Sequence, residues 1–182
     1  MIKDDNALYC PTHPEIGNCA IPTFRSNHIE GGSTHATAQF AHAEGRSTFA
    51  EGRFSHAEGH GTIAAGTGAH AEGMGSKALE NRGVHAEGWS TISFGNYGSH
   101  SEGCETSAVG TNGSHAEGYQ TKASDVAAHA EGVATKATGR SSHAEGYKSE
   151  ATNYGAHAEG GNYNGNIIGG KATGIASHAE GL

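Results

Sequence analysis

Residues 55–68 read SHAEGHGTIAAGTG, and variants of this 14-residue pattern fill most of the chain. The pattern contains a His-x-Glu-Gly element that occurs eleven times, with 14 or 15 residues between successive histidines and one interval of 21. The eleven pairs are His28 and Glu30, His42 and Glu44, His56 and Glu58, His70 and Glu72, His85 and Glu87, His100 and Glu102, His115 and Glu117, His129 and Glu131, His143 and Glu145, His157 and Glu159, and His178 and Glu180. Such self-similarity is typical of repeat architectures.

Each period consists of two similar halves. If the residue before the histidine is position 1, then positions 1, 3, 8 and 10 are almost always Ala, Ser or Thr, and Gly stands at position 5 and often at position 12. This alternation predicts two short strands per coil, with the small residues facing a narrow lumen. We expect the glycines of both positions to supply positive φ angles at the corners. A coiled coil is excluded, because glycine costs about 1 kcal/mol per helical position.

The sequence therefore predicts an all-β fold, a parallel β-roll (β-solenoid) with 14-residue coils stacked about 4.8 Å apart. Composition alone would indicate disorder, because Leu, Ile, Val and Phe make up about 12% of 182 residues and the formal net charge is −8. The repeat overrides that reading. No window approaches 18 apolar residues, so no membrane span is expected. No Lys/Arg-rich stretch is present either, which disfavours nucleic acid as a partner.

The repeat divides the chain into two parts. Residues 1–26 carry all three prolines and form a separate N-terminal segment, whereas residues 27–182 form the β-roll, with a loop insertion at 161–167. The start of the sequence has no apolar run of the kind that marks a secretory signal peptide. The beginning of the chain carries one weak signal for a small zinc site, although the spacing of its ligands fits no standard zinc finger. Its ligands would be Cys10, His13, Cys19 and His28.

The unit small-x-Ala-x-Gly-x-x-Ser/Thr-x-Ala-x-Gly resembles the head repeats of YadA-like trimeric adhesins and the β-roll repeats of phage and prophage tail fibres. The resemblance covers residues 27–182. It implies a left-handed parallel β-roll, a side-by-side homotrimer, and an extracellular role in attachment, on a cell surface or a virion. At positions 2 and 4, where the family typically has Val and Ile at the trimer centre, this chain has His and Glu.

Three interpretations of the His and Glu rows are open. The two side chains could pair between adjacent chains and replace the apolar interface, they could form a solvated ladder, or rings of them could bind a divalent metal such as zinc or nickel. Pairing would raise the folded pKa of each His and lower that of each Glu. It therefore predicts greatest stability in mildly acidic to neutral solution.

Catalysis is not expected, because the histidines recur in every coil and no nucleophile motif such as G-x-S-x-G is present. No cofactor is expected, apart from the open question of a divalent metal. The sequence thus predicts a structural or adhesive fibre or head module that binds an unidentified protein or glycan receptor. The alternatives are a self-assembling extracellular filament subunit and a metal-binding solenoid lined with His and Glu. The best candidates for receptor contact, in the predicted loop, are Asn162, Tyr163 and Asn164.

Overall fold

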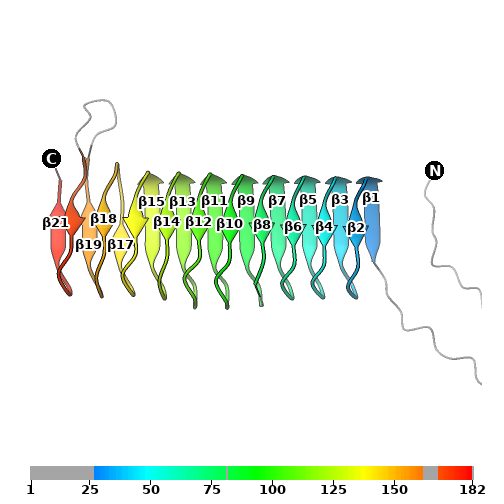
Figure 1. The fold of residues 1–182 in the computed structure, drawn as a ribbon, viewed down its shortest axis with the longest axis horizontal. Helices are drawn as coiled ribbons and strands as arrows, with labels where there is room; N and C mark the ends of the chain where they lie inside the picture. Colours follow the sequence, from blue (N-terminus) through cyan, green and yellow to red (C-terminus); the bar gives the residue numbers. More distant parts are fainter. Residues whose placement is uncertain (1–26, 81, 162–167, 182) are drawn as a thin grey trace, which may run out of the picture.

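The computed structural model describes residues 27–80, 82–161 and 168–181. Within these ranges the chain contains only strands, turns and irregular segments, so the expected all-β fold is confirmed. The chain winds into a rod in which successive coils are stacked along the long axis (Figure 1). The described residues include no helix that is long and apolar enough to cross a membrane.

The rod is built from two parallel sheets that the chain visits in alternation, which makes it a parallel β-solenoid. The eleven-stranded sheet consists of β1 (His28–Gly32), β3 (His42–Arg46), β5 (His56–His60), β7 (His70–Met74), β9 (His85–Trp89), β11 (His100–Cys104), β13 (His115–Tyr119), β15 (His129–Val133), β17 (His143–Ala144), β19 (His157–Glu159) and β21 (His178–Glu180). The ten-stranded sheet consists of β2 (His35–Ala36), β4 (Phe49–Ala50), β6 (Ile63–Ala64), β8 (Lys77–Ala78), β10 (Ile92–Ser93), β12 (Ser107–Ala108), β14 (Lys122–Ala123), β16 (Lys136–Ala137), β18 (Glu150–Ala151) and β20 (Lys171–Ala172).

The register places identical residues beside one another. In the pairing of β5 with β7, His56 lies opposite His70, and Glu58 lies opposite Glu72. The same match of His with His continues through the 15-residue coils and across the 21-residue interval, where His157 lies opposite His178. Each repeat of the sequence therefore adds one step to every column of the rod.

The core is a narrow lumen filled by small side chains, as the alternation predicts. The alanines at position 3 of the regular coils, such as Ala57 and Ala71, are fully buried, and so are the residues at position 8, such as Thr62 and Ser76. Where serine replaces alanine at position 3, its buried hydroxyl group is hydrogen-bonded. The hydroxyl groups of Ser101 and Thr106 lie 2.7 Å apart in a hydrogen bond.

The glycines at position 5, apart from Gly181 in the last repeat, have the predicted positive φ, for example +116° at Gly88. The prediction for position 12 was wrong, because Gly52, Gly66, Gly95, Gly110 and Gly139 do not have positive φ. These glycines are instead needed for close approach, since a Cβ on each would overlap a backbone carbonyl oxygen of the next coil.

The other corners with positive φ, which is the left-handed backbone conformation, lie at position 7 and just before position 1. Non-glycine residues occupy most of them, including Ser47 (φ 56°) and Phe54 (φ 58°). The 15-residue coils place two left-handed residues in succession at the second corner, for example Tyr97 and Gly98. The extra residue of these coils is thus accommodated at the corner before position 1.

Candidate functional site: the histidine–glutamate ladder

The ladder consists of the eleven His and Glu pairs of the repeat, and the geometry of the long strands positions it. The His is the first residue of each strand of the eleven-stranded sheet, and in most coils the Glu is the third. Because side chains alternate along a strand, the residue between them points into the lumen while His and Glu point outward on one face. The burial of Ala57 beside half-exposed His56 and Glu58 shows this alternation directly.

The imidazoles form a continuous column along the rod, in which most successive rings are stacked, whereas His28 and His42 meet edge to face at 68°. Successive ring centroids are 4.5–4.9 Å apart, and the most parallel pairs, such as His143 with His157, are inclined by only 2°. From His42 to His157 the imidazole side chains are 33–39% exposed. The stack therefore shields much of each ring from water while leaving its outer edge accessible.

Each glutamate in the regular part of the ladder lies beside the histidine of its own coil. The Nε2–Oε2 distances from His28–Glu30 to His143–Glu145 are 3.4–3.9 Å. Within these same-coil pairs only His56 with Glu58 and His70 with Glu72 are hydrogen-bonded, both at 3.4 Å. The Nε2 atoms of seven imidazoles are shielded from water without a hydrogen bond: His42, His85, His100, His115, His129, His143 and His157. The pairing expected between chains thus exists in part within one chain.

The electrostatics of the stack differ from the expectation. Burial lowers the pKa of His42, His85, His115 and His143, and the neighbouring imidazoles of the stack lower it further. Nearby carboxylates oppose this effect without overcoming it: those of the same coil at His42, His85 and His115, and those of the neighbouring coils, Glu131 and Glu159, at His143. Within the single chain, desolvation and imidazole–imidazole repulsion therefore outweigh the Glu partner at these four residues and lower the pKa. The rise expected from pairing between chains stays a prediction.

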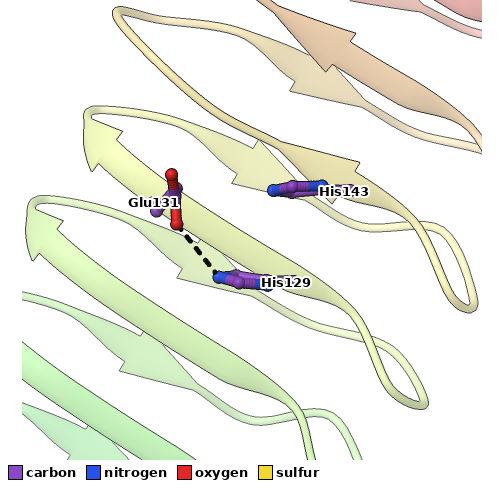
Figure 2. Close-up of side chains that lie close together, drawn as sticks. All are labelled: His129, Glu131 and His143. Atoms are coloured by element: carbon purple, nitrogen blue, oxygen red, sulfur yellow. Dashed lines mark ion pairs between the residues drawn. The ribbon is translucent and has the colours of Figure 1, made fainter.

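The regular ladder is poorly arranged for a metal ion held by two histidines. Figure 2 shows His129 and His143 with Glu131, whose ligand atoms all lie within 4.8 Å of one another. The two rings are stacked with centroids 4.7 Å apart and an inclination of 18°. A nitrogen lone pair lies in the plane of its ring, so the lone pairs of stacked rings run nearly parallel and do not converge on one ion.

Several predicted site residues lie outside the described residues. These are the receptor-contact candidates Asn162, Tyr163 and Asn164, and the weak zinc ligands Cys10, His13 and Cys19. His28, the fourth ligand suggested for this zinc site, lies within the described residues. It belongs to the ladder, with its ring centroid 4.5 Å from that of His42 and its Nε2 3.6 Å from Glu30 Oε2.

Sequence reasoning missed a charged column on the ten-stranded sheet. Glu150 is bracketed by lysines of the neighbouring coils, with Nζ–Oε distances of 3.1 Å to Lys136 and 2.8 Å to Lys171. Hydrogen bonds from Lys171 and Lys136 lower the pKa of Glu150. The 14-residue register contained the signal, because all three residues occupy position 9 once the 21-residue interval is taken into account.

The fold and the ladder define a class of structure: a parallel β-solenoid that carries one His and one Glu outward at each coil. Beyond that class, the chain matches no protein-family model, no curated protein and no solved structure.

Proposed function

We propose that the chain forms a rigid, side-by-side homotrimer of left-handed β-rolls, a non-catalytic fibre or head module that attaches to a protein or glycan receptor outside the cell. The observation that supports this proposal is the unbroken ladder face. The face carries one column of imidazoles and one column of carboxylates, with one member of each per coil.

A second copy of this chain is the partner that such a face fits best. Its columns have the same spacing, so parallel copies can match His with Glu at every coil. A single coil buries little apolar surface, since its lumen contains mainly Ala, Ser and Thr. Contacts between copies would supply further stability.

The number of copies and the winding sense come from the resemblance to YadA-like repeats, and mass measurement tests the number. We expect light scattering on the purified chain to give about 55 kDa, three times the chain mass of 18.5 kDa. A monomer would contradict the proposal. An open-ended polymer would replace it with the filament alternative.

Paired substitutions test which face is used. Glu87→Arg with Glu117→Arg places two bulky cations on the ladder face, and we expect this variant to be monomeric. Ile92→Arg with Ser107→Arg places the same side chains on the ten-stranded sheet and should leave the assembly intact. Circular dichroism confirms that both variants fold. If the second variant dissociates and the first does not, the ladder is not the contact face.

Attachment is tested with fluorescently labelled protein on whole bacterial cells and cultured animal cells. We expect saturable binding by the assembled chain to at least one cell type, and competition by excess unlabelled protein. Linear, non-saturable uptake by every cell type would contradict an adhesive role while leaving the assembly result unaffected.

A further inference from the structure

The ladder changes its geometry near the last coils. In the regular coils Glu belongs to the strand, as Glu131 does in β15, but β17 ends at Ala144 and Glu145 lies just beyond it. There the Glu145 carboxylate lies between two coils, with Oε2 3.9 Å from His143 Nε2 and Oε1 3.8 Å from His157 Nε2. This carboxylate thus faces two histidines.

The Glu145 carboxylate also contacts the carboxylate of Glu159. The side chains of Glu145 and Glu159 are hydrogen-bonded to each other, which raises the pKa of Glu145, and Glu159 is held on its other side by His178, 2.9 Å away. Two carboxylates in contact repel each other unless a cation, such as a proton, lies between them. A divalent cation can do the same with twice the charge.

A nitrogen ligand completes the group. The Nε2 atom of His157 is shielded from water and has no hydrogen bond, and one ligand atom each from Glu145, His157 and Glu159 lie within 4.8 Å of one another. Ligands at about 2.0–2.2 Å from a tetrahedral zinc ion are roughly 3.3 Å apart. Glu145 Oε1 and His157 Nε2 are 3.8 Å apart, so a small adjustment of these side chains brings the two atoms to the spacing that zinc requires.

We propose that Glu145, His157 and Glu159 bind one Zn²⁺ ion through two carboxylate oxygens and one imidazole nitrogen, with the fourth position open to water. Only one imidazole takes part, so the parallel lone pairs that disfavour the His129–Glu131–His143 group do not arise. The ion joins the coil of β17 to the coil of β19.

Calorimetry with ZnCl₂ on the EDTA-treated full chain tests this site at pH 7.5. We expect one tight site per chain, and a loss of at least tenfold in affinity for Glu145→Gln and for Glu159→Gln. The matched control Glu87→Gln removes the same oxygen from the same position of a regular coil and should keep wild-type affinity. Glutamine preserves side-chain size, and circular dichroism verifies that each variant folds.

Thermal unfolding provides a second measurement. Saturating Zn²⁺ should raise the Tm of the wild type and of Glu87→Gln, but not that of Glu145→Gln. Two results would overturn the proposal. One is equal Zn²⁺ affinity in wild type and Glu145→Gln. The other is binding of many weak equivalents per chain, which would indicate nonspecific capture by the imidazole column.

The zinc site does not depend on the proposed assembly, because all three ligands belong to one chain. The monomeric ladder-face variant Glu87→Arg with Glu117→Arg should still bind one Zn²⁺ per chain. If instead zinc binds at one ion per three chains and the ratio is insensitive to Glu145→Gln, the ion lies between chains. That result would refute the intrachain site while supporting the trimer.

Discussion

The glycine at position 5 is the residue on which each coil depends most directly. Its φ of +116° in Gly88 lies in a region that residues with a Cβ rarely adopt, and a Cβ there would overlap the carbonyl oxygen of Gly103 in the next coil. Conformation and space therefore both require glycine.

A pair of glycine substitutions separates these two requirements. Gly98 also has positive φ, +72°, but no heavy atom lies within 4 Å of its ideal Cβ position. We expect Gly98→Ala to cost about 1 kcal/mol and Gly88→Ala at least about 3 kcal/mol of unfolding free energy. In a domain of this size the larger loss lowers Tm by roughly 6–12 °C. Equal Tm values for the two variants would show that the close approach to Gly103 does not matter.

The repeat thus revealed where glycine is needed, but not always why. Position 12 has a weaker glycine signal than position 5, and there the cause is contact with the next coil, which depends on the three-dimensional stacking. The left-handed corners were invisible for the opposite reason. Phe54 and Ser47 occupy them without any glycine signature, because their side chains lie at the outer corners and the strain is about 1–2 kcal/mol at most.

At the scale of the strands, the alternation of small and large residues was sufficient to predict the two sheets, the lumen and the outward direction of His and Glu. The sign of the His pKa change was not predictable. It depends on how closely the rings stack and how much water they lose, and neither quantity can be obtained from spacing. The charged column of Lys136, Glu150 and Lys171, by contrast, could have been found from the spacing, because all three residues occupy position 9.

The lowered pKa values predict how the ladder responds to acid. A His whose folded pKa lies below the unfolded value near 6.5 stabilises the fold fully above pH 6.5, and its contribution is lost as the pH falls through the folded value. His85 has the imidazoles of His70 and His100 on either side and the Glu87 carboxylate beside it. We therefore expect Tm to fall between pH 8 and pH 5.

Ring-preserving variants identify the histidines responsible. His85→Phe with His115→Phe keeps the aromatic stack but removes two titrating groups, and should weaken the dependence of Tm on pH. His60→Phe, outside the column, is the control and should leave it unchanged. A Tm that rises on acidification would instead support the original pairing expectation.

At the scale of the whole molecule, the rod is a sum of nearly equal coils. In such quasi-one-dimensional folds, stability is approximately the sum of intrinsic and nearest-neighbour contributions. Because Ser114 precedes His115 and Ala128 precedes His129, deletion of residues 115–128 rejoins a position 1 residue to a histidine. The columns on both sheets then remain continuous.

Deletions of different length test this modularity. We expect removal of residues 115–128 to preserve the β-type circular dichroism spectrum and cooperative unfolding, and to shorten the rod by about 4.8 Å. Removal of only residues 115–121 shifts every later histidine to the opposite sheet and interrupts the imidazole stack, so a much lower Tm is expected. Small-angle scattering and thermal unfolding measure the two outcomes, and similar Tm values would argue against a stabilising stack.

The corner before each histidine has a practical consequence. Coils that hold two left-handed residues there, such as Tyr97 and Gly98, keep the His85, His100 and His115 register intact despite their extra residue. Backbone length can therefore vary at this edge of the molecule without disturbing its interior. Peptide epitopes grafted at that edge would be displayed in a straight line at regular intervals, which makes the protein a scaffold for multivalent display at a defined spacing.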